Sequence, residues 1–352
     1  MAAGGGGREA YMETKLLGTT KPDIEEAARI IREGGLVAFP TETVYGLGAD
    51  AMNSEAVSKV YKAKGRPSDN PMIVHIAGPE QILQLTFEVT GDMKKLMEVF
   101  WPGPLTMVVP ARPEVPRVTT GGLDTVAVRM PKNDATLRLI AEAGTPLAGP
   151  SANLSGHPSP TRASHVDDDL HGRIDAIIED VPCQVGIEST VVDMTGQTPA
   201  ILRPGAVTVR QLSDALGKPV EIDPAILVRP DIAKDGGLLE TGSDYKPKAP
   251  GMKYKHYAPK AEMIIFRGDP QKVRLAMAEE KMYRMECGQK VGIIMYGDDQ
   301  KEAAHDFFAQ LRAFDKSGVD VILAAAVKED GIGFALMNRM FKSAGYNIRE
   351  VE

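Results

Sequence analysis

The sequence predicts an α/β protein with two domains, and three observations support this. Short apolar runs alternate with segments of helical periodicity along the chain. This periodicity fades from about Asp223 to Pro259 and returns beyond it. The length of 352 residues makes two domains the natural expectation. We therefore expect a mixed α/β domain over residues 15–210, a linker or lid over 211–259, and a parallel α/β domain over 260–352.

The composition is that of an ordinary globular protein, with 43% apolar and 25% charged residues. A formal net charge of −7 argues against a protein that grips nucleic acid through a broad basic face, so we expect no stable nucleic-acid complex. No apolar run is long enough to cross a bilayer, and we expect no membrane association. The glycine-rich start lacks an apolar signal core, so residues 1–14 are expected to be a disordered tail.

The cysteine content indicates the compartment. Cys183 and Cys287 lie far apart and fit neither a disulfide framework nor a metal-ligand spacing. We therefore expect a reducing, cytoplasmic location and no metal site held by protein side chains.

The elements of the first domain follow from apolar runs and turn residues. A short edge strand is expected over 15–19. A helix then begins at Asp23, whose side chain can cap it together with Glu26, and Gly34 and Gly35 end this helix. The apolar run 36–39 predicts a buried strand. Further strands are expected over 72–76, 105–109, 125–129, 147–149, 174–178, 190–193 and 200–203, and helices over 54–64, 81–85, 91–100, 134–143 and toward residue 170.

The stretch from residue 36 to residue 75 contains the first concentration of reactive side chains. Hydroxyl groups, among them that of Thr43, follow the strand 36–39 between glycine-containing turns. Lys64 and Arg66 lie where the next helix stops, and His75 lies in the strand after it. Taken singly, such cations usually complement the helix dipole, and a lone strand histidine is usually packed core. Taken together, they predict an anion site.

Several strand ends repeat this pattern. A hydroxyl or an arginine stands at each, namely at Thr43, Arg129, Ser151, Ser189 and Arg203. Loops at the carboxyl ends of strands are where open α/β sheets bind their ligands. The repetition therefore favours a site over surface decoration.

The linker ends in a basic, aromatic segment, KPKAPGMKYKHYAP. Long ordered loops are often lids or binding loops, although a basic linker that is merely solvated is the alternative. Beyond it, strands are expected over 263–266, 291–296 and 319–323, and helices over 271–285, 300–314 and 333–344. No G-x-G-x-x-G follows the first of these strands, which argues against a dinucleotide site there.

Several familiar catalytic motifs are absent. The chain has no P-loop, no H-E-x-x-H, no Cys/His metal cluster and no G-x-S-x-G. Its Lys, Arg, Ser, Thr and Asn groups are suited to binding phosphate and carboxylate. The residues by themselves thus predict an anion or nucleotide site in an α/β domain.

Seven strings carry a resemblance to a known family. In order, they are FPTETVYGLGA, KxKGRPSDNPMIVHI, FWPGPLT, GLDTVAVRMP, PLAGPSANLSGHPSPT, GIESTVVD and ILRPGAV. This set resembles the threonylcarbamoyl-AMP synthase family, and the linker and the C-terminal segment resemble its longer, two-domain branch. The resemblance implies a twisted, mixed, open sheet with a concave site, the YrdC-like fold, followed by a smaller Rossmann-like parallel domain.

The resemblance also implies site residues, with Lys64 and Arg66 in the catalytic role. L-threonine would be bound by Thr43, His75, Arg129 and Ser189, with Arg129 pairing its carboxylate. ATP would be bound by Arg66, Asn70, Thr125, Ser151, Asn153, Ser159, Arg203, His256 and Tyr257.

The implied reaction joins L-threonine, bicarbonate and ATP into threonylcarbamoyl-AMP and pyrophosphate, with Mg²⁺ sharing the charge. A partner tRNA threonylcarbamoyl transferase then moves the threonylcarbamoyl group to adenosine 37 of tRNA. The adenylate hydrolyses readily, so a lid that excludes water has a chemical purpose.

Two alternatives have different signatures. An RNA-binding module would show a tRNA affinity that falls steeply with salt, without pyrophosphate release. A carbamoyl transferase of hydrogenase maturation would carry zinc-finger-like cysteines and an acylphosphatase module, and this chain has neither.

Overall fold

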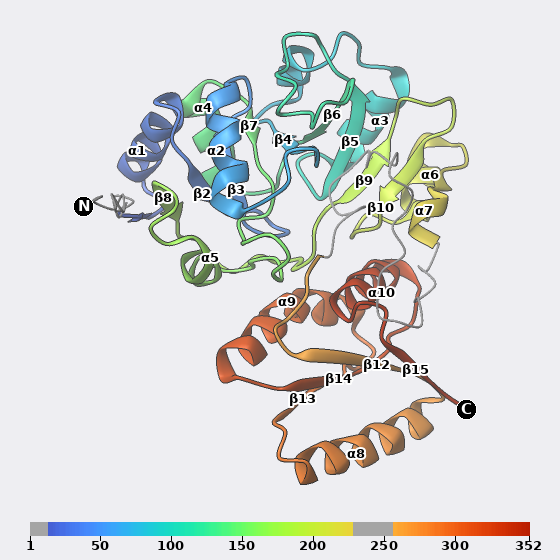
Figure 1. The fold of residues 1–352 in the computed structure, drawn as a ribbon. Coiled ribbons are helices and arrows are strands. Elements are labelled where there is room, and N and C mark those ends of the chain that lie inside the picture. The colour runs from blue at the N-terminus through green and yellow to red at the C-terminus, as the bar shows by residue number, and fades with distance from the viewer. Residues whose placement is uncertain (1–12, 228–255) are drawn as a thin grey trace, which may run out of the picture.

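The computed structural model describes residues 13–227 and 256–352, which form a larger and a smaller α/β domain (Figure 1). Most of the expected tail and much of the expected linker lie outside the described residues. Thr14, at the edge of the expected tail, is buried, and its hydroxyl donates a hydrogen bond of 2.7 Å to the Ile174 carbonyl. The expected boundary of the tail is therefore too late.

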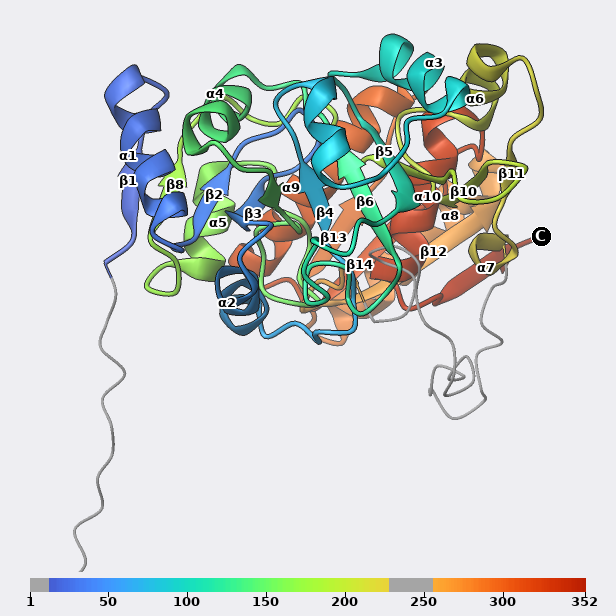
Figure 2. The same ribbon diagram turned by 90° about the horizontal axis from the view of Figure 1, so that it is seen from above.

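An eleven-stranded mixed sheet forms the centre of the first domain, in the order β1-β8-β2-β3-β7-β4-β6-β5-β9-β10-β11. Figure 2 shows it extending from β1 and α1 at one end to β10 and β11 at the other. Its strands are β1 (Lys15–Leu17), β2 (Val37–Phe39), β3 (Gly46–Asp50), β4 (Ile73–His75), β5 (Leu105–Pro110), β6 (Thr125–Arg129), β7 (Leu147–Ala148), β8 (Ala176–Ile178), β9 (Thr190–Asp193), β10 (Ala200–Arg203) and β11 (Glu221–Ile222).

The helices of this domain cover the sheet. They are α1 (Lys21–Arg32), α2 (Ser54–Lys64), the 3₁₀ helix η1 (Pro79–Gln84), α3 (Gly91–Phe100), α4 (Asp134–Ala143), α5 (Ala163–Leu170), α6 (Val209–Leu216) and α7 (Pro224–Leu227). Asn53 and Asn133 cap α2 and α4 with their side chains, and Gly65 and Gly144 end these helices in the left-handed conformation.

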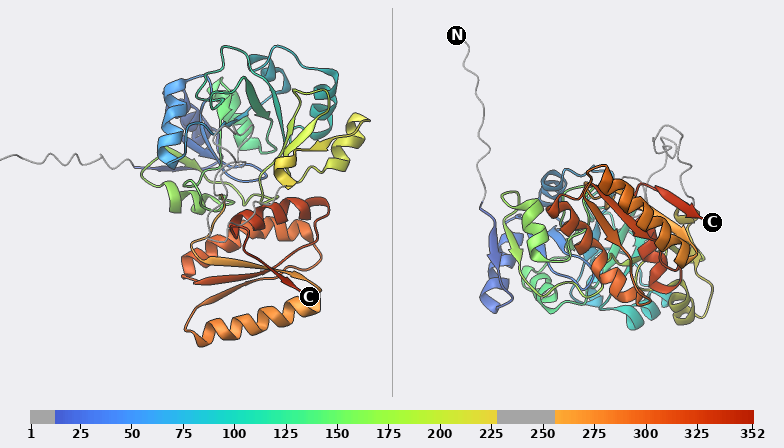
Figure 3. Two further views of the ribbon diagram at one scale, coloured as in Figure 1. Left: turned by 45° about the vertical axis from the view of Figure 1, so that its right-hand side comes forward. Right: turned by 90° about the horizontal axis from the view of Figure 1, so that it is seen from below.

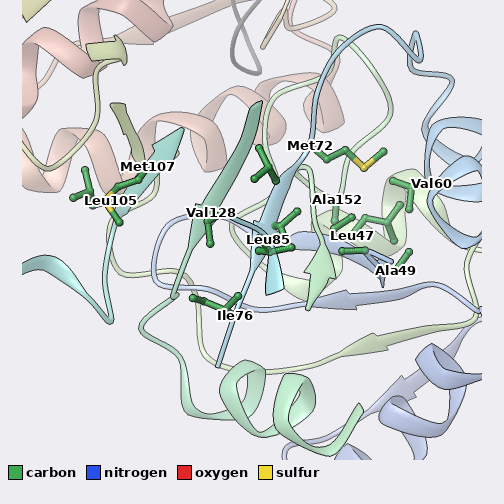
Figure 4. Packing of buried hydrophobic residues seen from close by; sticks show 14 of the residues in the cluster. Leu47, Ala49, Val60, Met72, Ile76, Leu85, Leu105, Met107, Val128 and Ala152 are labelled. Carbon is green, nitrogen blue, oxygen red and sulfur yellow. The ribbon is translucent and has the colours of Figure 1, made fainter. Parts of the chain in front are cut away.

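The core of the first domain joins strands and helices that are distant in sequence. Figure 4 shows Leu47 of β3 close to Val60 of α2, with Val128 of β6 and Met107 of β5 farther along the same cluster. Two glycines allow the backbone to approach the ring of Phe39. A Cβ on Gly46 or on Gly149 would lie 2.4 or 2.6 Å from its Cζ atom, so neither position has room for a side chain.

A four-stranded parallel sheet of order β13-β14-β12-β15 forms the C-terminal domain. Its elements are β12 (Glu262–Gly268), α8 (Pro270–Glu286), β13 (Val291–Ile294), α9 (Gln300–Ser317), β14 (Val321–Ala325), α10 (Gly331–Ser343) and β15 (Ile348–Val351). Figures 1 and 3 show α9 and α10 between this sheet and the first domain, with α8 on the opposite face.

The interface between the domains is both apolar and ionic. Val44 and Ile187 of the first domain are buried in one cluster with Phe307 and Phe308 of α9. Arg312 of α9 forms an ion pair of 2.9 Å with Asp169 of α5, and both side chains are at least 90% buried. The C-terminal domain is therefore docked on the first domain through specific contacts.

Four expectations about the elements were wrong. Asp23 does not cap α1, because Pro22 favours an earlier start and the N-cap is Thr20, whose hydroxyl bonds to Asp23 at 2.5 Å. The turn expected around Gly46 is the strand β3, since its glycines fit against Phe39. The sheet continues past residue 210, because β11 pairs with β10. The chain ends in an unexpected strand, β15, which pairs with β12.

Two further findings on the described residues concern membrane-spanning helices and cysteines. None of their helices is long and apolar enough to cross a membrane. Cys183 is buried and Cys287 is exposed, and both are free thiols.

Candidate active site

A small cavity of about 60 Å³ lies where several strand ends of the first domain meet the start of the C-terminal domain. Nine of the predicted site residues line it, and they come from segments spread over more than 200 positions. They are Thr43, Arg66, His75, Arg129, Ser151, Ser189, Arg203, His256 and Tyr257. Of the lining residues that the structure describes, three are arginines and one, Glu188, carries a carboxylate, which favours an anionic ligand.

Arg129, at the end of β6, has more polar partners among the described residues than either of the other two arginines of the cavity. Its guanidinium donates to the Thr43 hydroxyl at 2.8 Å and to the Gly103 carbonyl at 3.2 Å, and it forms an ion pair of 2.7 Å with Glu42. The Thr41 hydroxyl fixes this loop, because it bonds to Thr43 at 2.8 Å and donates to the Val44 carbonyl at 2.6 Å. The loop after β2 thus presents Thr43 to the cavity in a fixed position.

His75 lies beside Arg129, because β4 and β6 are parallel and these two residues are in register. Its ring packs edge-on against Phe39 with the centroids 5.2 Å apart, and Nδ1 is buried without a hydrogen-bond partner. Burial and the charge of Arg129 lower the pKa of His75 to about 3. The imidazole is therefore neutral and has a free polar atom at neutral pH.

Ser189 and Arg203 form a second wall of the cavity. They lie beside each other because β9 and β10 pair as antiparallel strands. The Arg203 guanidinium donates to the Ser189 carbonyl at 3.0 Å and to its hydroxyl at 3.1 Å, and that hydroxyl also bonds to Thr106 at 2.8 Å. Burial lowers the pKa of Arg203. Its charge therefore lies in a poorly solvated place where an anion would be favourable.

Arg66 stands just past the end of α2 and has fewer partners. Its guanidinium donates to the carbonyls of Asn70 and Pro71, at 3.3 and 2.9 Å, while Nε is buried without a partner. Burial lowers the pKa of Arg66 to about 10. Among the described residues no carboxylate lies within ion-pair distance of it.

Five predicted site residues do not line the cavity. Lys64 is buried in α2, and its ammonium donates to the carbonyls of Ser151 and Asn153, so it anchors that loop from behind. Ser159 is also buried and bonds to Glu188. Thr125 begins β6, four residues from Arg129, which is about 13 Å along a strand. The other two are Asn70 and Asn153, and both are buried.

His256 and Tyr257 close the cavity from the C-terminal side. Tyr257 is buried with φ at 64°, and its ring packs on Phe308 with the centroids 5.2 Å apart. Burial and then the charge of Arg66 lower the pKa of His256 to about 3. The rest of the basic, aromatic segment, residues 246–255, lies outside the described residues.

Sequence reasoning missed three charged residues at the site. Glu42 pairs with Arg129, and Glu188 lines the cavity. Both lie inside strings that had been singled out, and each directly precedes a chosen hydroxyl residue, Thr43 or Ser189, which was an available signal. Arg339 of α10 pairs with Glu188 from 151 positions away, and no local pattern predicts that contact.

The low pKa of His75 makes stability depend on pH. An unfolded histidine binds a proton below about pH 6.5, whereas the folded His75 does so only near 3, so stability is full above 6.5 and is lost as pH falls. His75→Asn should reduce the slope of unfolding free energy against pH, between 6 and 4, by up to about 1.4 kcal/mol per unit. Urea unfolding at several pH values measures this slope, and equal slopes in the two proteins would contradict a neutral buried His75.

Comparisons with known proteins match both domains to known families. A family model described as "Telomere recombination" matches residues 29–205, and one described as "Threonylcarbamoyl-AMP synthase, C-terminal domain" matches 207–345. The threonylcarbamoyl-AMP synthase of Pyrococcus abyssi is 47% identical over 93% of this chain and 96% of its own length. That of Bacillus subtilis is 43% identical over 94% and 96%.

A solved structure agrees with these relatives. The crystal structure of Pyrococcus abyssi Sua5 complexed with L-threonine superposes with a TM-score of 0.88. It is 45% identical in sequence and covers 96% of this chain and all of that one. The likeness therefore extends over both domains and includes their arrangement.

Proposed function

Because this chain belongs to the threonylcarbamoyl-AMP synthase family, we propose that its cavity is the place where L-threonine, bicarbonate and ATP become threonylcarbamoyl-AMP and pyrophosphate. The observation that carries this proposal is the cavity's set of three buried or half-buried arginines facing one carboxylate. The substrates and products all carry negative charge, and such a site offsets their mutual repulsion.

L-threonine would occupy the end of the cavity at β4 and β6. Arg129 pairs the amino acid's carboxylate, since a guanidinium forms two parallel bonds to a carboxylate. Thr43 and Ser189 offer hydroxyls on either side, and the free Nδ1 of neutral His75 can accept a hydrogen bond. A site that bonds the substrate hydroxyl rejects amino acids without one.

ATP would occupy the end that Arg66, Arg203 and Ser151 line, with His256 and Tyr257 closing over it. Arg66 is suited to a phosphate, because its guanidinium is buried and has no carboxylate partner among the described residues. Lys64 and Asn153 would act from behind by fixing the loop that carries Ser151. We keep Asn70, Thr125 and Ser159 as proposed ATP contacts, although none of the three lines the cavity.

The chemistry follows from these charges. The amine of threonine bonds to the carbon of bicarbonate, and one water is lost to leave a carbamate. A carbamate oxygen then attacks the α-phosphorus as the bond to pyrophosphate breaks. The nucleophile and its target are both anionic, so the arginines stabilise the charge that develops on the leaving group. Tyr257 and the elements of the C-terminal domain would keep water from the labile adenylate.

Mg²⁺ would enter with ATP, bound by phosphate oxygens and water, as is usual for this ion. The described residues contain no group of three or more His, Cys, Asp or Glu side chains that could hold a metal. The product would pass to a tRNA threonylcarbamoyl transferase that modifies adenosine 37. Because that step takes place on tRNA and both thiols are free, we propose a cytoplasmic location.

Thr43→Val tests the threonine subsite. Valine keeps the shape of the side chain but removes the hydroxyl that Arg129 donates to at 2.8 Å. We expect KM for L-threonine to rise about 10- to 100-fold, the cost of about 1–3 kcal/mol for an unsatisfied buried donor, with KM for ATP little changed. Calorimetric titration with L-threonine measures the same loss directly. An unchanged affinity for threonine would place the amino acid elsewhere.

A further inference from the structure

Arg339 of α10 is a wholly buried guanidinium that reaches from the C-terminal domain into the first domain. Its Nε donates to the Glu188 carboxylate at 2.9 Å, and its Nη1 donates to the Pro204 carbonyl at 2.7 Å. Glu188 precedes Ser189 in the chain and Pro204 follows Arg203, so these two bonds hold both sides of the second wall of the cavity. A buried charge is tolerated only where it is paired in this way.

Glu188 connects Arg339 to the cavity. One oxygen of its carboxylate bonds to Arg339, and the other accepts a hydrogen bond from the Ser159 hydroxyl. Burial raises the pKa of Glu188, but the charges of Arg339 and Arg203 outweigh burial and hold it below its usual range. The carboxylate is therefore ionised, and within residues 13–227 and 256–352 it is the one negative side chain that lines the cavity.

We propose that Arg339 is a positioning residue through which the C-terminal domain completes the nucleotide subsite. It neutralises and orients Glu188, and through Glu188 and Pro204 it fixes Ser159 and Arg203. The inference rests on the proposed function, because those residues matter to ATP only if the nucleotide lies there. It gives the C-terminal domain a direct part in synthesis, beyond supporting the lid.

The consequence of losing Arg339 is electrostatic. The Glu188 carboxylate would remain in the wall with Ser159 as its hydrogen-bond partner, and the charges of Arg203 and of the buried Lys342 would still act on it. Arg203 would then be drawn to Glu188 and away from phosphate. Without the positive charge of Arg339 beside it, the Glu188 carboxylate would also repel the triphosphate of ATP. ATP binding should suffer more than threonine binding, which depends on Arg129 at the other end.

The test compares three variants with the wild type. Arg339→Met should raise KM for ATP at least tenfold, with KM for L-threonine changed less than threefold. Arg339→Met combined with Glu188→Gln removes both charges, so the ATP KM should return to within about threefold of wild type. Met277→Ala removes a buried side chain of α8, which packs on the face of the C-terminal sheet away from the first domain (Figure 3) and does not line the cavity. Its ATP KM should stay within about threefold while its melting temperature falls.

The outcomes separate a site role from a merely structural one. Equal changes of ATP KM in Arg339→Met and Met277→Ala, or no recovery in the double variant, would overturn the proposal. If Arg339→Met does not fold, Arg339→Lys takes its place, since lysine keeps the charge but cannot reproduce both bonds. Titration with a non-hydrolysable ATP analogue gives the affinity without turnover. A wild type that releases no threonine-dependent pyrophosphate would refute the proposed function instead.

Discussion

Arg129→Met should reduce threonine-dependent pyrophosphate release by at least a hundredfold. The guanidinium is buried, lines the cavity and is already oriented by Thr43 and Glu42 at 2.8 and 2.7 Å. Charge-assisted hydrogen bonds contribute about 1.5–3 kcal/mol each, so two bonds to the threonine carboxylate account for a loss of about two to four orders of magnitude. Steady-state kinetics with varied L-threonine measures the effect, which should fall mainly on KM for threonine.

A second variant separates binding from folding. Arg129→Met leaves the Glu42 carboxylate buried and unpaired, which costs stability by about 3–5 kcal/mol. Adding Glu42→Gln removes that charge and should recover much of the melting temperature without recovering activity. If the double variant regained threonine affinity, Arg129 would act through the fold and not through the substrate.

Arg66→Ala is the second change with a large expected effect. Its buried guanidinium has an unpartnered Nε and donates to two carbonyls of its own loop, those of Asn70 and Pro71. Losing one or two charge-assisted bonds to phosphate should lower kcat/KM for ATP by about ten- to a thousandfold. Stability should change little, because the fold gains few contacts from this side chain.

The control for Arg66→Ala is Arg210→Ala, a surface arginine paired with Asp214 at 3.7 Å and far more exposed. That variant should keep wild-type kinetics. Arg66→Lys should show an intermediate loss, because lysine supplies the charge without the planar fork. Near-normal turnover in Arg66→Ala would remove Arg66 from the catalytic machinery.

Much of the fold was predictable because the residues within most helices and strands are enough to indicate them. The apolar runs of β6 and β9 and the glycine that ends α2 follow directly from residue type. The strand β3 was missed because Gly46 and Gly48 are poor strand formers, and their use depends on the ring of Phe39 from another strand. The strand β15 was missed because its residues are largely exposed and alternate weakly.

The part of the site that lies within distinctive sequence motifs was predictable. Thr43, Arg129 and Arg203 stand in distinctive strings, and the structure brings them to one cavity. The partners that set their charge were not predictable, because Glu188 meets Arg339 through the docking of α10 on the first domain. Lys64 also shows the limit of a motif, since its ammonium is engaged with loop carbonyls behind the cavity.

The central claim is that one cavity brings L-threonine, bicarbonate and ATP together. Pyrophosphate release, with each substrate omitted in turn, tests it most directly. The account predicts release that requires all three substrates, falls with L-serine or L-valine in place of L-threonine, and is lost in Arg129→Met. Release that continues without threonine, or that survives in Arg129→Met at the wild-type rate, would contradict it.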